Sequence, residues 1–189
     1  MALTPSTMLD LGTPLPSVRL PSVLADPGAA AVETSALAGR PVLVLFLSAH
    51  CPYVKHIEAE ISRLAADYGE RIQLIGIASN SVLTHPQDGP EGLRHQARTH
   101  GWTFPYLFDA DQTVARAFQA ACTPDPFLFD ADHRLVYRGQ LDGSRPGNAV
   151  PCDGRDLRAA IEAVLAGQTV NPEQRPSIGC NIKWHPEAA

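Results

Sequence analysis

Basic residues are scarce in this chain. It has 15 lysines and arginines against 20 aspartates and glutamates, a net charge of −5, and no basic stretch. Nucleic-acid binding needs clustered lysine and arginine to displace the counterions of the phosphates, so we expect no nucleic-acid partner. The opening sequence MALTPSTMLDLGTPLP has no basic lead, and no apolar run is long enough to span a bilayer. We therefore expect a cytoplasmic protein with neither a secretory signal nor a membrane partner.

Paired metal ligands are also missing. The four cysteines, Cys51, Cys122, Cys152 and Cys180, form no CxxC pair, and the seven histidines show no ligand spacing. Structural zinc sites use such pairs, so we expect no metal and no other cofactor. A chain of this size without a secretory signal has no need of structural disulfides, so each cysteine is interpreted separately.

Length and composition indicate one globular domain. The chain has 189 residues, of which 44% are hydrophobic and 19% charged, enough to bury a single core. We expect one domain over residues 1–189, with a core of about residues 10–167 and a non-helical tail over 168–189. Residues 1–40, rich in proline, glycine and small side chains, are expected to form an extended lead with a short hairpin.

Apolar patterns predict alternating strands and helices. Residues 41–47 and 72–78 are almost continuous apolar runs, typical of strands buried on both faces. Between them, apolar side chains at steps of three and four predict a helix that begins at Pro52 and ends at Gly69. These side chains are Val54, Ile57, Ile61, Leu64 and Tyr68.

The second half predicts a hairpin followed by a helix. After a short helix ending near Gly101 come an extended piece over 104–108 and a helix over about 111–120. Residues 127–129 and 135–141 then flank an Asp-rich turn, and 155–166 predict the last helix. Strand, helix, strand, helix and then a hairpin and a helix is the thioredoxin arrangement. The expected fold is thus α/β, with a central mixed sheet flanked by helices, an N-terminal extension and a C-terminal tail.

Cys51 is the candidate reactive group. It lies between a buried strand and an amphipathic helix, where backbone N–H groups converge and the helix dipole favours thiolate over thiol. His50 and Lys55 add positive charge nearby. The alternative is an inert core cysteine, since free cysteine is often buried. Position at a helix N-cap favours the reactive thiol.

Three segments give the chain a resemblance to a known family. They are residues 47–56 (LSAHCPYVKH), 121–130 (ACTPDPFLFD) and 177–184 (SIGCNIKW). Together they resemble the thioredoxin-like, peroxiredoxin-like proteins of the alkyl hydroperoxide reductase/thiol-specific antioxidant branch. The resemblance implies a thioredoxin fold, Cys51 as the reactive cysteine, and a cis-proline at Pro124 facing it. Substrate is then expected to bind beside four residues: Pro52, Tyr53, Thr123 and Pro124.

The chain departs from the two patterns of that resemblance. Val54 stands where thioredoxins carry their second cysteine, so Cys51 has no disulfide partner within its own motif. Ser48 fills the peroxiredoxin Thr/Ser position, but Val44 stands where peroxiredoxins carry a proline. No arginine is assignable to polarising a peroxide. Arg138 is the nearest candidate by order along the chain.

The thioredoxin topology ranks the other cysteines as resolving partners of Cys51. The strand after Pro124 begins at the rim where the Cys51 strand ends, so Cys122 ranks first. Cys180 ranks second, because the tail must return from the far rim along the length of a helix, which its fourteen residues permit. Cys152, in the loop over 142–154, ranks third.

The leading hypothesis is a thiol-dependent oxidoreductase of antioxidant type. The Cys51 thiolate attacks a peroxide or a disulfide, with Ser48 and His50 in the site, and another thiol resolves the product. An external reductant, thioredoxin or a low-molecular-weight thiol, then restores the enzyme. The alternative is a non-catalytic thioredoxin-fold module that binds a partner on the Pro124 surface, and a metal-binding variant ranks third. The sequence leaves the oligomeric state open.

Overall fold

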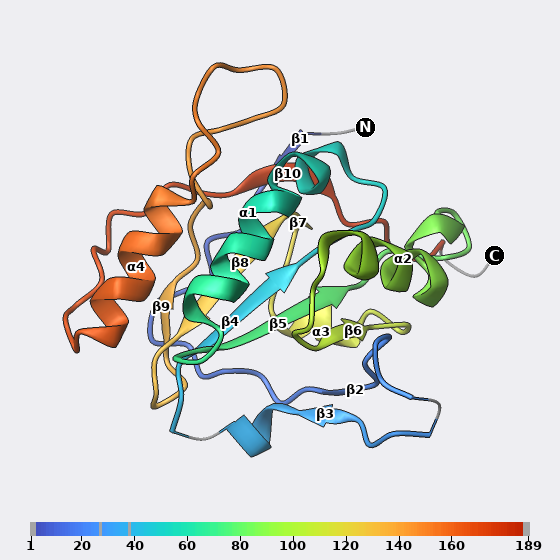
Figure 1. The fold of residues 1–189 in the computed structure, drawn as a ribbon, viewed down its shortest axis with the longest axis horizontal. Helices are drawn as coiled ribbons and strands as arrows, with labels where there is room; N and C mark the ends of the chain where they lie inside the picture. The colour runs from blue at the N-terminus through green and yellow to red at the C-terminus, as the bar shows by residue number, and fades with distance from the viewer. Residues whose placement is uncertain (1–2, 27, 38, 187–189) are drawn as a thin grey trace.

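The central sheet contains both parallel and antiparallel strands. The computed structural model, shown in Figure 1, describes residues 3–26, 28–37 and 39–186. Its five-stranded sheet has the order β6-β5-β4-β8-β9: β6 (Tyr106–Phe108), β5 (Gln73–Ala78), β4 (Val42–Phe46), β8 (Asp125–Phe129) and β9 (Leu135–Tyr137). Strands β4, β5 and β6 are parallel, whereas β8 runs antiparallel to β4 and to β9. The predicted mixed α/β sheet is confirmed.

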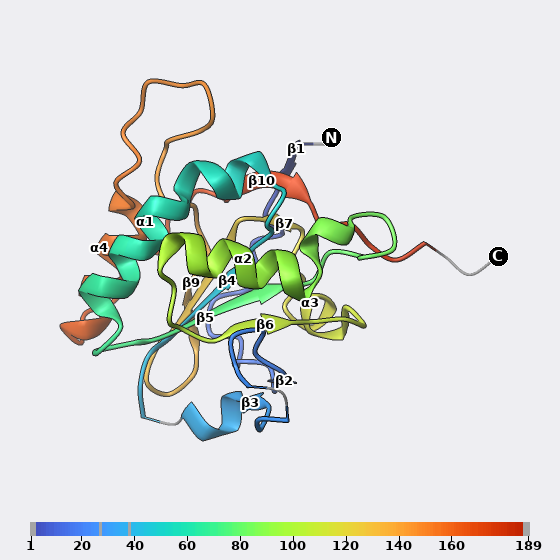
Figure 2. The ribbon, with the colours of Figure 1, turned by 45° about the vertical axis from the view of Figure 1, so that its right-hand side comes forward.

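Both faces of this sheet are buried because alternate residues of each strand point to opposite sides. Leu43 and Leu45 pack with three helices: α1 (Pro52–Tyr68), α2 (Pro90–His100) and α4 (Arg155–Leu165). Val44 and Phe46 pack on the other side, with the short helix α3 (Thr113–Ala117) and the N-terminal segment. Figures 1 and 2 show α1 and α2 over the same face of the sheet, with α4 beside β9.

Helix α1 positions the candidate cysteine and follows its predicted bounds. Pro52 occupies its first turn, and the helix ends before Gly69, whose backbone N–H donates to the carbonyl of Ala65. The predicted apolar stripe from Val54 to Tyr68 is buried against the sheet. None of the helices in the described part of the chain is both long and apolar enough to cross a membrane.

The first and last strands of the described chain pair in a second, three-stranded sheet. Its order is β1-β10-β7, with β1 (Leu3–Pro5), β10 (Ile178–Asn181) and β7 (Cys122–Thr123) all antiparallel. The tail expected to be non-helical thus contains a strand, and its Ile182 is buried in the core. The short elements that remain are β2 (Arg19–Leu20) and β3 (Val32–Glu33), which pair as the expected hairpin, and the 3-10 helices η1 (Thr34–Leu37) and η2 (Pro86–Asp88).

Candidate active site around Cys51

Cys51 lies at the junction of the central strand and the first helix. Strand β4 ends at Phe46, and Cys51 is the N-cap of α1, with an extended backbone conformation (φ −68°, ψ 121°). Its side chain is completely buried. The thiol donates to the carbonyl oxygen of Thr123, with Sγ 3.2 Å from that oxygen. Cys51 is therefore placed at the helix start as predicted, but beneath other chain segments.

The tail places a second thiol against Cys51. The Sγ atoms of Cys51 and Cys180 are 2.8 Å apart, and both cysteines are free. Strand β10 holds Cys180 there by pairing with β7, with Cys180 opposite Thr123. Burial, and then the neighbouring Cys51 thiol, raise the pKa of Cys180 to about 12, while the charge of Lys183 and the backbone N–H of Tyr53 act in the opposite direction.

Cys180, ranked second from the sequence, is thus the thiol that lies against Cys51, whereas Cys122 was expected there. Cys122, expected as the nearest partner, is buried with its Sγ 3.6 Å from the carbonyl oxygen of Pro124. In the pairing of β7 with β10, Cys122 lies opposite Asn181, whereas Cys180 lies opposite Thr123. Because neighbouring residues of a strand point to opposite faces, the side chain of Cys122 points to the face opposite that of Cys180. Burial raises the pKa of Cys122, and the neighbouring Asp125 adds to the shift. Cys152 lies near His56 on α1, with Sγ 3.8 Å from the His56 carbonyl oxygen.

The loop before β8 forms the other wall of the site. The peptide bond between Thr123 and Pro124 is cis. Gly179 of β10 packs directly on this bond, because a Cβ atom at position 179 would overlap the carbonyl of Thr123. The hydroxyl Oγ1 of Thr123 is buried and has no hydrogen-bond partner among the described residues. Two expected substrate-binding residues thus line the site, but β10 covers them.

A buried carboxylate that the sequence did not indicate lies beneath the loop before Cys51. Asp88 accepts hydrogen bonds from Ser48 Oγ (2.9 Å), His50 Nδ1 (2.7 Å) and Asn80 Nδ2 (2.6 Å). Ser48 Oγ in turn accepts the backbone N–H of Cys51 at 3.1 Å. The two expected residues Ser48 and His50 are therefore brought to the site, and both are bound to Asp88.

Arg138, the candidate for polarising a peroxide by its order along the chain, is bound to the segment after α4 rather than to the Cys51 loop. The Nη1 atom of Arg138 donates to Gln174 Oε1 at 3.0 Å, in the segment that follows α4. The cationic side chain that acts on the thiols is instead Lys183, beside Cys180, and two histidine rings, those of His50 and His85, lie at the loop before Cys51. The rings of His50 and His85 are stacked, with their centroids 4.6 Å apart. Burial lowers the pKa of His85, and the charges of His50 and Lys183 lower it further.

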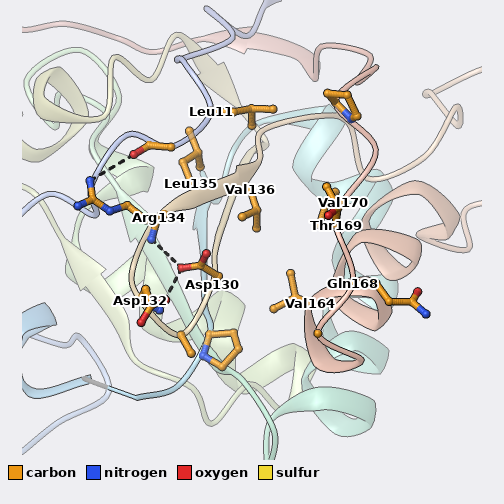
Figure 3. Close-up of a pocket in the computed structure, with 15 residues that line it drawn as sticks. Leu11, Asp130, Asp132, Arg134, Leu135, Val136, Val164, Gln168, Thr169 and Val170 are labelled. Atoms are coloured by element: carbon orange, nitrogen blue, oxygen red, sulfur yellow. Dashed lines mark hydrogen bonds between the residues drawn. The ribbon is translucent and has the colours of Figure 1, made fainter.

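One cavity lies remote from Cys51. It measures about 670 Å³ and opens at the other end of the sheet, where β4 begins, between the β8–β9 turn and the end of α4. Figure 3 shows Asp130 and Arg134 on one side of it and Val164 on the other. Within residues 3–26, 28–37 and 39–186, no three histidine, cysteine or acidic side chains are grouped so that they could hold a metal ion.

Comparison with known structures identifies the class. The chain is similar to an uncharacterized conserved protein from Geobacillus kaustophilus at 42% identity, with a TM-score of 0.94 over 100% of this chain and 99% of that one. It is also similar to a hypothetical protein from Sinorhizobium meliloti 1021, at 42% identity and a TM-score of 0.91 over 96% and 98% of the two chains. A thiol:disulfide interchange protein of the thioredoxin family from Chlorobium tepidum TLS shares the fold at 18% identity, with a TM-score of 0.62 over 82% and 97%. This is a thioredoxin-like fold.

The family follows from the sequence match. The model of the AhpC/TSA family matches residues 11–138, so the chain belongs to this family of thiol-dependent redox proteins. A search of curated proteins gives no match. The matched range includes Cys51 and Pro124, and ends before the strand that carries Cys180.

Proposed function

We propose that this protein is a thiol oxidoreductase in which Cys51 attacks the oxidant and Cys180 resolves the product as an internal disulfide. The observation that carries the proposal is the 2.8 Å separation of the two Sγ atoms. A disulfide needs sulfur atoms about 2.05 Å apart, so a small movement joins them. Val54 replaces the second cysteine of a CxxC motif, and β10 supplies a thiol in its place.

The chemistry balances with either class of oxidant. With a hydroperoxide, the Cys51 sulfur takes the terminal oxygen, the O–O bond breaks, and an alcohol or water leaves with the thiol proton. Cys180 then attacks the sulfenic acid, and water leaves as the disulfide forms. With a disulfide substrate, Cys51 forms a mixed disulfide and Cys180 displaces the second substrate thiol. In both cases an external thiol, from thioredoxin or a low-molecular-weight compound, supplies the two electrons that restore the dithiol.

The alternative of a partner-binding module on the Pro124 surface has less support. That surface is occupied by the chain's own strand, since Gly179 packs on Thr123 and Pro124. The strand is held on both sides, by β1 and by β7. Ser177 Oγ also donates to the Pro124 carbonyl at 2.6 Å, and the backbone N–H of Ile182 donates to Ala121 at 3.0 Å.

Intact-mass analysis after one equivalent of hydrogen peroxide tests the proposal. The parent protein should lose the mass of two hydrogen atoms, and peptide mapping should find Cys51 joined to Cys180. Cys122→Ser and Cys152→Ser are matched controls that should behave like the parent. Cys51→Ser should remain reduced, and Cys180→Ser should gain one oxygen or an added thiol at Cys51. A disulfide to Cys122 or Cys152, or no oxidation of Cys51, would contradict the assignment.

A further inference from the structure

Asp88 is a charged group in a place where charge is costly. Its side chain is 0% exposed. Burial by itself acts to raise the pKa of Asp88, but hydrogen bonds from His50 and Asn80 outweigh it, so the pKa lies below its ordinary value. A buried carboxylate is costly unless an opposite charge and hydrogen bonds compensate it. Among the described residues its ion-pair partner is a histidine, His50.

The bonds to Asp88 converge on the loop that carries Cys51. Ser48 Oγ lies 2.9 Å from Asp88 Oδ2, and the backbone N–H of His50 donates to Oδ1 at 3.1 Å. Ser48 Oγ also accepts the N–H of Cys51, so a chain of two hydrogen bonds through Ser48 links the backbone of Cys51 to the Asp88 carboxylate. Asn80, at the end of β5, anchors the carboxylate from the other side. This arrangement fixes both the loop and the carboxylate.

The same carboxylate determines which nitrogen of His50 is available. Nδ1 donates to Asp88 Oδ2 at 2.7 Å, so a neutral ring carries its proton on Nδ1 and leaves Nε2 with a free lone pair. Nε2 is buried, and the described residues provide it with no hydrogen-bond partner. The charged or titratable groups that face the ring are Asp88, the stacked His85 and, through His85, Lys183. Nε2 is thus the ring nitrogen left for an incoming polar atom.

We propose that Asp88 is a positioning residue for the chemistry of Cys51, which holds His50 so that Nε2 exchanges a proton with the reacting groups. This rests on the proposed function. Because the described residues leave Nε2 without a hydrogen-bond partner before the oxidant binds, the bound hydroperoxide relays the proton: the Cys51 thiol proton passes through the hydroperoxide to Nε2, which returns it to the leaving alkoxide or hydroxide. The ring is unchanged at the end of the step, and sulfur and peroxide exchange two electrons.

The first test is made on the unmodified full-length protein. Nitrogen-15 NMR of the histidine rings distinguishes the two neutral tautomers and needs no activity. The proposal requires the Nδ1–H tautomer for His50 above neutral pH, whereas free histidine favours a proton on Nε2. If His50 carries its proton on Nε2, the proposal is overturned, whatever the fate of any variant.

The second test compares two matched substitutions. Asp88→Asn removes the carboxylate at nearly constant size. Asp109→Asn makes the same change at a carboxylate that is 1% exposed and accepts from Ser79 Oγ (2.7 Å) and two backbone N–H groups, without a histidine. The rate of Cys51 oxidation by hydrogen peroxide is measured from about pH 5 to about pH 9. Asp88→Asn should lower the rate at least about tenfold near neutral pH and remove the histidine step from the profile.

The results of these tests distinguish a failure of the positioning role of Asp88 from a failure of the proposed oxidoreductase function. Asp109→Asn should keep the shape of the pH profile. A uniform loss of rate in Asp88→Asn, with the histidine step intact, would show that Asp88 is only structural and would overturn the positioning role. If Cys51 instead fails to form a disulfide with Cys180 in the parent protein, the proposed function fails, while the tautomer of His50 still decides the role of Asp88.

Discussion

Gly179 lies so close to Thr123 that a Cβ atom at position 179 would overlap both the carbonyl oxygen and the carbonyl carbon of that residue. The same atom would stand 3.2 Å from Cδ of Pro124. Only glycine therefore permits β10 to lie flat on β7. Because Cys180 is the next residue, the contact between the two thiols depends on this close backbone approach.

Gly179→Ala should lift β10 away from β7 and separate Cys180 from Cys51. Overpacking of this kind costs about 1–3 kcal/mol of stability. We expect slower disulfide formation after peroxide treatment and faster alkylation of Cys51 by iodoacetamide, since the variant uncovers a completely buried thiol. Quenched mass spectrometry over time measures both rates.

The control for this variant is Gly143→Ala. A Cβ atom at Gly143 would meet only Cγ1 of Val150, at an ordinary 3.6 Å. Both rates should stay at the parent value in this control. Unchanged rates in Gly179→Ala as well would show that β10 is not what brings the thiols together.

Asp125 should make the stability of the protein fall as the pH rises. Burial raises the pKa of Asp125 to about 7, whereas a carboxyl in the unfolded chain titrates near ~3.9. Between these values the unfolded chain releases a proton that the folded protein retains. The free energy of unfolding therefore decreases with rising pH, by at most about 1.4 kcal/mol per pH unit from this group, and its contribution is constant above the folded pKa.

Urea unfolding of Asp125→Asn and the parent across this pH range measures the effect. The stability of the variant relative to the parent should increase from about pH 4 to about pH 7 and then level off. Asp111→Asn is the matched control, because Asp111 is exposed and hydrogen bonds from Thr113 lower its pKa. If the free energies of unfolding of Asp125→Asn and the parent changed in parallel with pH, Asp125 would be ionised in the folded protein over the whole pH range, and the prediction would be wrong.

The central sheet and α1 were predictable because they leave a local pattern. Solid apolar runs mark β4 and β5, and spacing of three and four residues marks α1 between Pro52 and Gly69. Strand β10 leaves no such pattern. Its sequence, IGCN, contains glycine and asparagine, which strands usually lack, and its partners lie more than fifty residues away in the chain. Only the closed tertiary structure shows that the tail belongs to the sheet.

The candidate site was predictable in part for the same reason. Cys51 is marked by its place at a strand–helix junction, His50 by standing next to it, and Ser48 by the peroxiredoxin Thr/Ser position that it fills in the resemblance. Asp88 lies in a polar stretch with proline and glycine that reads as a surface loop, and a single aspartate there gives no sign of burial. Its importance arises from Ser48 and His50, forty and thirty-eight residues away, which donate to it.

Val54→Cys should return to the first turn of α1 the thiol that the sequence lacks there. Val54 is completely buried and faces the core, and a cysteine of similar volume should cost less than about 1.5 kcal/mol. Combined with Cys180→Ser, it should restore the internal disulfide that Cys180→Ser alone loses, because a CxxC pair at a helix N-terminus is suited to bridging. The control Lys55→Cys in the same background places a thiol one residue further on, where the side chain is exposed, and should not restore it. Disulfide mapping after mild oxidation distinguishes the two. Failure of a folded Val54→Cys, Cys180→Ser protein to join the introduced thiol to Cys51 would contradict the geometry assigned to the start of α1.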